Sequence, residues 1–158
     1  MVPRRPAAAV AALLLASGAL LAGCTSTVSL QPADASNDPR CADVSVRLPD
    51  AVDGQERRWT DAQATGAWGD PASVILTCGL EPPGPTTLPC QSVNGVDWII
   101  DESDAPRYRV TTFGRTPAVE VYLDNDVVSS AAVLDSLSQI VAVLPTDGSE
   151  CTESGSSD

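Results

Sequence analysis

The sequence predicts an α+β domain, in which an antiparallel sheet of four to five strands packs one face against a single C-terminal amphipathic helix. Two patterns in the chain predict this class. Between residues 44 and 123, apolar and polar residues alternate along several short segments, as they do in half-buried strands. From residue 133 to residue 144, apolar residues recur at intervals of three and four, as they do on one face of a helix.

The predicted strands follow one another along the middle of the chain and cover residues 44–48, 73–78, 96–101, 107–113 and 119–123. The segment 73–78 is almost continuously apolar, so we expect it at the centre of the sheet. Residues 57–69 show no clean period, and we expect Trp59 and Trp68 in this segment to be partly buried. Short segments rich in Gly, Pro and Asn separate the strands, as turns do.

The predicted helix carries its apolar residues on one face, at Val133, Leu134, Leu137, Ile140, Val141 and Leu144. Ser129 or Ser130 can cap its first turn, because a hydroxyl oxygen at this position accepts a hydrogen bond from a free backbone N–H. Pro145 and Gly148 then end the helix.

The N-terminal segment has the features of a bacterial lipoprotein signal. Two arginines precede the uncharged segment 7–22, which is shorter than the roughly 20 residues that a membrane-spanning helix needs. The segment ends in LAGC, residues 21–24, which resembles the lipobox whose cysteine thiol receives a diacylglyceryl group. We therefore interpret residues 1–23 as a lipoprotein signal peptide and Cys24 as the lipidated residue. An ordinary secretory signal with an unrelated cysteine is the alternative.

The rest of the chain divides into three parts. We expect the lipidated cysteine and a flexible tether at residues 24–40, a globular disulfide-bonded domain at 41–151 and a disordered tail at 152–158. The polar tether would span about 20–24 Å as a coil. Removal of the signal peptide takes two arginines away, so that seven arginines stand against 21 acidic residues and the net charge is −14.

Five cysteines are an odd number, and assigning Cys24 to the lipid leaves four. Outside the cytoplasm, four thiols indicate two disulfides, for which three connectivities are possible. We favour Cys41–Cys151, which would join the two ends of the domain, together with Cys78–Cys90, which would close a proline-rich loop. A zinc site is the competing interpretation, but the chain has no histidine and no C-x₂-C pair.

Composition excludes several classes of activity. The chain has no histidine and no lysine, which excludes Ser-His-Asp and Cys-His catalysis, His-ligated metals and Schiff bases. Its acidity argues against nucleic acid as a partner, and we expect no cofactor. Paired carboxylates remain possible, and the acidic clusters contain Asp97, Asp101, Glu102, Asp104, Asp124 and Asp126. We interpret these acids as residues that solvate turns and strand ends.

Arg107, Arg109 and Arg115 lie close together in a β-rich segment and are the candidate anion-binding residues. Alternation along a strand places the first two on one face, and Arg115 could reach the same side. Tyr108 and Val110 indicate that the other face is the core side. The alternative is that the arginines form ion pairs with acids of this chain, such as Glu120.

Three stretches of the domain, AWGDPASVILTCGL, CQSVNGVDW and TTFGRTPAVEVYL, combine with the lipobox into a recognisable pattern. The chain resembles the actinobacterial envelope proteins that are grouped as domain of unknown function 3515. The elements W-G-x-P, C-G and F-G-R-x-P and the four domain cysteines match over about residues 41–151. The resemblance implies an actinobacterial, membrane-anchored protein. It implies no activity and no catalytic residues.

These observations together predict an extracytoplasmic lipoprotein of the cell envelope with a binding or accessory role. Its expected partners are the membrane, through the lipid on Cys24, and an envelope protein or an anionic envelope ligand. The alternative function is a small carboxylate-dependent hydrolase that acts on cell-wall polymer. A close pair of carboxyl groups in a cleft would favour the enzyme, and acids spread over convex surface would favour the binding role.

Overall fold

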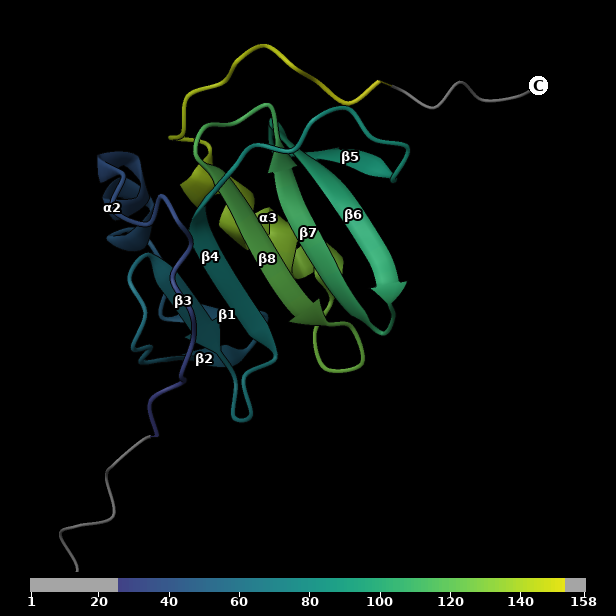
Figure 1. Ribbon diagram of the computed structural model, residues 1–158. Helices are drawn as coiled ribbons and strands as arrows, with labels where there is room; N and C mark the ends of the chain where they lie inside the picture. Colours follow the sequence, from purple (N-terminus) through teal and green to yellow (C-terminus); the bar gives the residue numbers. More distant parts are fainter. Residues whose placement is uncertain (1–25, 153–158) are drawn as a thin grey trace, which may run out of the picture.

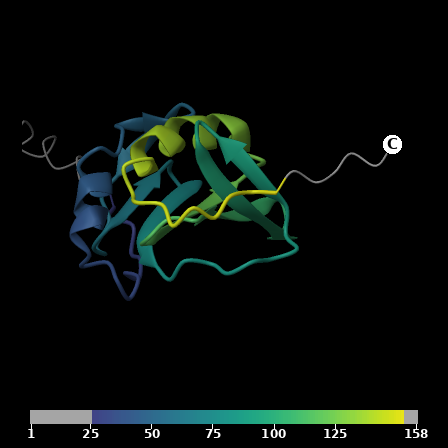
Figure 2. The same ribbon diagram turned by 90° about the horizontal axis from the view of Figure 1, so that it is seen from above.

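The computed structural model describes residues 26–152. The predicted signal peptide, the predicted lipidation site Cys24 and residues 153–158 of the predicted tail lie outside the described residues. An eight-stranded antiparallel sheet forms the frame, with the strand order β1-β2-β3-β4-β8-β7-β6-β5. Helix α3 lies on one face of this sheet, and the connection from β4 to β5 runs on the other side (Figures 1 and 2).

The elements in chain order are α2 (Pro39–Ser45), β1 (Ala51–Val52), β2 (Gln55–Arg58), β3 (Thr65–Trp68), β4 (Val74–Leu80), β5 (Cys90–Val93), β6 (Val96–Asp104), β7 (Arg107–Phe113), β8 (Ala118–Asp124) and α3 (Ser130–Val141). The predicted class, α+β with an antiparallel sheet and a C-terminal helix, is confirmed. Ser129 is the N-cap of α3, and its side chain accepts a hydrogen bond from the Ala132 N–H. In the part of the chain that the structure describes, no helix is long and apolar enough to cross a membrane.

The predicted strand number is wrong, because the sheet has eight strands and not four to five. The strands that the sequence did not predict are β1, β2, β3 and β5, which have two to four residues each. Segments this short cannot show an alternating pattern, and β2 is entirely polar. Their hydrogen bonds to longer neighbours, rather than their own residue pattern, make them strands.

The predicted strand at residues 44–48 is also wrong, because helix α2 runs through its beginning. Asp38 caps this helix by accepting a hydrogen bond from the Arg40 N–H, and Pro39 follows as the first helical residue. A strand would place Val44, Val46 and Leu48 on the same face. Val44 and Leu48 are buried, but Val46 between them is 79% exposed. Residues four apart share a face in a helical turn as well as in a strand, so the sequence pattern fitted both.

The hydrophobic core lies between the sheet and α3. The inward side chains of the central strands alternate with outward ones, and Leu76, Val121 and Val110 are almost completely buried on β4, β8 and β7. Trp98 is fully buried and its indole N–H donates to Ser138 Oγ of α3 at 2.9 Å. We expected Trp59 and Trp68 to be partly buried, and this prediction is wrong for both. Trp68 is fully buried, and Trp59 is 78% exposed.

Two disulfides join the four cysteines of the domain, but in a pairing that differs from the one we favoured. Cys41 pairs with Cys78, and Cys90 pairs with Cys151. Cys78 and Cys90 cannot pair, because β4 and β5 are four positions apart in the sheet, which corresponds to about 15–20 Å at the usual strand spacing. The proline-rich connection between them therefore crosses the sheet instead of closing a small loop (Figure 1).

Much of the predicted tether belongs to the folded unit. Val28 N–H donates to the Trp59 carbonyl at 2.8 Å, Leu30 N–H donates to Asp61 Oδ1 at 2.8 Å, and Ala35 N–H donates to the Gly79 carbonyl at 3.0 Å. Gly79 permits the last contact, because a Cβ at this position would lie 2.6 Å from the Ala35 backbone. Residues 28–35 therefore contact the folded domain, although we expected them in the flexible tether.

Candidate functional site

Arg107 and Arg109 lie on the face of the sheet that α3 does not cover. The next residue of the strand, Val110, points to the other face and is buried in the core. Each arginine has an acidic partner on β8. Arg107 Nε lies 3.8 Å from Asp124 Oδ2, and Arg109 Nη1 donates to Glu120 Oε1 at 3.0 Å. Both arginine side chains are about half exposed. Their geometry fits the ion-pair alternative as well as a charged docking face.

Arg115 lies apart from the other two, beyond the far end of β7. Its side chain is almost completely buried, and its guanidinium donates to the carbonyls of Ala142, Leu144 and Gly95 at 3.1, 2.7 and 2.8 Å. Two of these carbonyls follow the C-terminal end of α3, where a cation also complements the helix dipole. Burial lowers the pKa of Arg115, and the negative charge of Asp97 opposes this shift. The structure therefore does not bring the three predicted arginines together into one site.

A candidate site is the cavity of about 620 Å³ beside Arg115. Its walls come from β5, from the beginning of β6, from the end of β7 and from the segment 146–152. They include Gln91, Asp97, Phe113, Arg115, Ser149 and Cys151. A cavity of this size is in the range that small ligands occupy in proteins. Its lining includes the buried Arg115 guanidinium and the Asp97 carboxylate, whose charge acts on Arg115, and the surrounding wall is mostly polar.

Several bonds hold the C-terminal segment in place as a wall of this cavity. Cys151 is joined to Cys90 of β5, and its N–H donates to Asp97 Oδ2 at 2.7 Å. Asp147 N–H donates to the Gly114 carbonyl at 3.0 Å. Gly114 has a φ of +68°, and a Cβ there would collide with the carbonyl of Ser149, so only glycine fits this turn. The cavity is thus built by covalent and backbone contacts.

The acidic residues outside the cavity act mainly in local turns. Hydrogen bonds from Ser103 lower the pKa of Asp101, and hydrogen bonds from Ser149 lower the pKa of Asp147. Leu30 N–H and the Ser29 hydroxyl lower the pKa of Asp61 in the same way. A general acid in glycoside hydrolysis needs the opposite, a raised pKa. Within residues 26–152, no three Cys, Asp or Glu side chains are grouped so that they could hold a metal ion.

A protein-family model that is described as "Protein of unknown function (DUF3515)" matches residues 6–148 of this chain. The chain belongs to the DUF3515 family. No match is found among curated proteins or among solved structures. In this DUF3515 protein, the F-G-R-x-P element, residues 113–117, carries Phe113 and Arg115 into the cavity wall. The W-G-x-P element, residues 68–71, begins the turn between β3 and β4.

Sequence reasoning identified Arg115 but not the site around it. The cavity is formed by three segments that are separated by more than 15 residues in the chain, and no local motif connects them. The contact between Asp97 and the Cys151 N–H depends on the pairing of Cys151 with Cys90, which the sequence left open among three connectivities. No signal in the sequence indicates that Arg115, Asp97 and Cys151 line one cavity.

Proposed function

We propose that this DUF3515 protein is a lipid-anchored protein on the extracytoplasmic face of the cell membrane, with a binding or accessory role in the actinobacterial envelope. One observation carries the proposal. The two disulfides use all four cysteines of the described residues, so Cys24, which ends the lipobox, is the one that remains. Disulfides persist in oxidising compartments, and a lipobox cysteine is the acceptor of a diacylglyceryl group.

The charge of the chain supports attachment by lipid. A net charge of −14 after removal of the signal peptide does not favour an anionic membrane surface. Stable attachment of such a protein depends on buried acyl chains, and two chains on one residue suffice for it.

The cavity beside Arg115 supports the binding role. Arg115 and Asp97 offer opposite charges to a ligand, and polar groups such as Gln91 and Ser149 line the surrounding wall. An anionic envelope group or a carboxylate-bearing segment of a partner protein fits this chemistry.

The experiment is cell fractionation of the full-length chain and a Cys24→Ser variant, followed by mass spectrometry of the N-terminal peptide. The wild-type protein is expected in the membrane fraction with a diacylglyceryl group on Cys24. The variant is expected in the soluble fraction or as an unprocessed precursor, because an oxygen cannot replace the thiol in this reaction. Thr25→Ser is the matched control and should behave like wild type. A Cys24→Ser protein that fractionates and migrates like wild type would refute the anchor.

A further inference from the structure

Trp59 differs from the other two tryptophans of the protein because it is 78% exposed, whereas Trp68 and Trp98 are fully buried. It follows directly after β2 and lies beside the first described residues. Its carbonyl accepts a hydrogen bond from Val28 N–H at 2.8 Å, and Val28 forms a parallel bridge with Thr60. A large apolar side chain therefore stands free at the place where the chain enters the domain.

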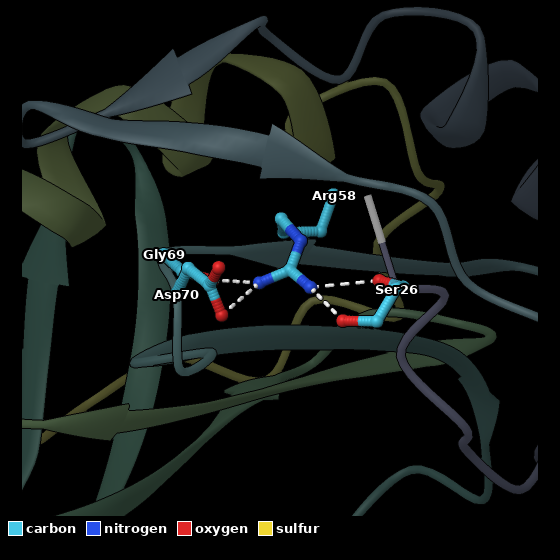
Figure 3. Close-up of polar contacts among 4 residues, drawn as sticks. All are labelled: Ser26, Arg58, Gly69 and Asp70. Atoms are coloured by element: carbon cyan, nitrogen blue, oxygen red, sulfur yellow. Dashed lines mark hydrogen bonds and ion pairs between the residues drawn. The ribbon is translucent and has the colours of Figure 1, made fainter. Parts of the chain in front are cut away.

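Arg58, the neighbour of Trp59, fixes this entry point (Figure 3). Its Nη2 donates to the Ser26 carbonyl at 2.7 Å and to Ser26 Oγ at 2.8 Å. Its Nη1 lies 2.8 Å from Asp70 Oδ1 and donates to the Gly69 carbonyl at 2.9 Å. One guanidinium thus joins Ser26 to the turn between β3 and β4, and its side chain is only 10% exposed. We call these bonds the Arg58–Ser26 contact.

The Arg58–Ser26 contact leaves a very short link to the lipidated residue. Ser26 is two residues after Cys24, and two residues span at most about 7 Å. A free tether of the predicted length would instead allow about 20–24 Å. The polar headgroup layer of a membrane is about 5–8 Å thick on each side. With acyl chains on Cys24, the surface around Ser26 and Trp59 therefore lies at the headgroup layer.

From this we infer that Trp59 is a second membrane contact, whose indole enters the headgroup layer and gives the anchored domain one orientation. The inference rests on the proposed lipid anchor. Tryptophan is the side chain that prefers the membrane–water interface, because its ring is apolar and its N–H is polar. The partner is the lipid surface that holds the anchor. A net charge of −14 gives no attraction to that surface, so the tryptophan, and not a basic patch, orients the domain.

This orientation directs the cavity away from the membrane. In Figure 1, the described chain begins at the lower end of the sheet, while the C-terminal segment and the connection from β4 to β5 cross the upper end. The cavity is lined by the C-terminal segment and by β5, so it lies at the end of the sheet away from the first described residues. A ligand of the cell wall could then reach it without competition from lipid.

The test uses the full-length lipidated protein in vesicles of phosphatidylcholine and phosphatidylglycerol, some of which carry brominated acyl chains that quench nearby tryptophans. Wild type is expected to lose up to one third of its emission, the share of one tryptophan in three. Trp59→Phe should lose none, because its remaining tryptophans are buried. As a matched control, Trp59→Phe with Leu88→Trp places a tryptophan at a partly exposed site in the connection from β4 to β5, and it should not be quenched.

The outcomes separate this inference from the proposed anchor. Wild-type protein that does not sediment with vesicles refutes the anchor, whereas protein that sediments but shows the same quenching as Trp59→Phe refutes the membrane contact. Quenching of the Leu88→Trp control equal to wild type would mean that the domain has no fixed orientation and would also overturn the inference.

Arg58→Gln should keep sedimentation but reduce quenching, because the link to Cys24 becomes longer. Trp59-dependent crosslinking to an envelope protein without lipid quenching would assign the tryptophan to a protein partner instead.

Discussion

At the scale of single residues, the three arginines at positions 107, 109 and 115 have different roles in the fold although they are close in the sequence. Arg115 is buried and supplies donors to three carbonyls, while Arg107 and Arg109 are half exposed and pair with acids of β8. The alternation of β7 was sufficient to predict that Arg107 and Arg109 share a face. The burial of Arg115 was not predictable, because its acceptors come from residues 142 and 144 and from Gly95.

A double change of Arg107 and Arg109 to Gln separates recognition from stability. Exposed ion pairs contribute only about 0–1 kcal/mol each, so the melting temperature should change little. If this face binds an anionic envelope group or an acidic partner surface, complementation of a deletion phenotype should be lost. Arg115→Gln is the comparison variant, and we expect it to lower the free energy of unfolding by about 1–3 kcal/mol, because buried carbonyls lose their donor.

The free energy of unfolding of each arginine variant is measured by urea unfolding, and its function is measured by complementation of the deletion strain. Full complementation by the double variant, or a loss that only follows reduced stability, would leave these two arginines as structural residues of β7. An Arg115→Gln protein as stable as wild type would show that its carbonyl acceptors find water instead.

At the scale of elements, long and regular segments were predictable and short ones were not. The helix α3 and the strands β4, β6, β7 and β8 carry clear periods in the sequence. The strands β1, β2, β3 and β5 are formed by pairing with neighbours, and α2 has a residue spacing that also fits a strand. The disulfide pairing depends on strand order, and strand order depends on contacts between residues that are distant in the chain.

The two disulfides should differ in their resistance to reduction. Cys41 and Cys78 are fully buried, whereas Cys90 and Cys151 are half-buried at the cavity wall. Under mild reductant without denaturant, Cys90 and Cys151 should therefore be alkylated first, and peptide mapping of the unreduced protein should recover Cys41–Cys78 and Cys90–Cys151. Replacing both Cys90 and Cys151 by Ser should lower the free energy of unfolding by about 4 kcal/mol, since the closed loop is long. Equal labelling of all four cysteines would contradict this order.

At the scale of the whole molecule, charge determines the response to acid. The pKa values of Asp61, Asp101 and Asp147 are lower in the folded state than the ordinary value of 3.8, because each carboxylate accepts hydrogen bonds from backbone and serine groups. Their stabilising contribution is therefore present above pH 3.8 and is lost as the pH falls through the lowered folded values. Between pH 7 and about pH 5 the charge of the chain changes little, because it has no histidine and its carboxylates stay ionised.

The melting temperature should thus stay nearly constant from pH 7 to about pH 5 and fall below about pH 4. The measurement is thermal unfolding across this range at low and at high salt. High salt should raise the melting temperature at pH 7, because it screens repulsion between the acidic residues, and should leave the acid-side fall. A melting temperature that declines steadily from pH 7 to about pH 5 would contradict this account.

The two outer strands of the sheet are short, so neighbouring molecules have little strand edge through which they could pair. Strand β1 has two residues and β5 has four, Cys90 of β5 is tied to Cys151, and both strands contact α3. A lipid anchor would confine many copies to a plane, where neighbouring molecules collide side by side far more often than in solution. Long exposed strand edges would then join from one molecule to the next. Edges of this length offer few free backbone groups, so anchored copies would remain separate even at high density.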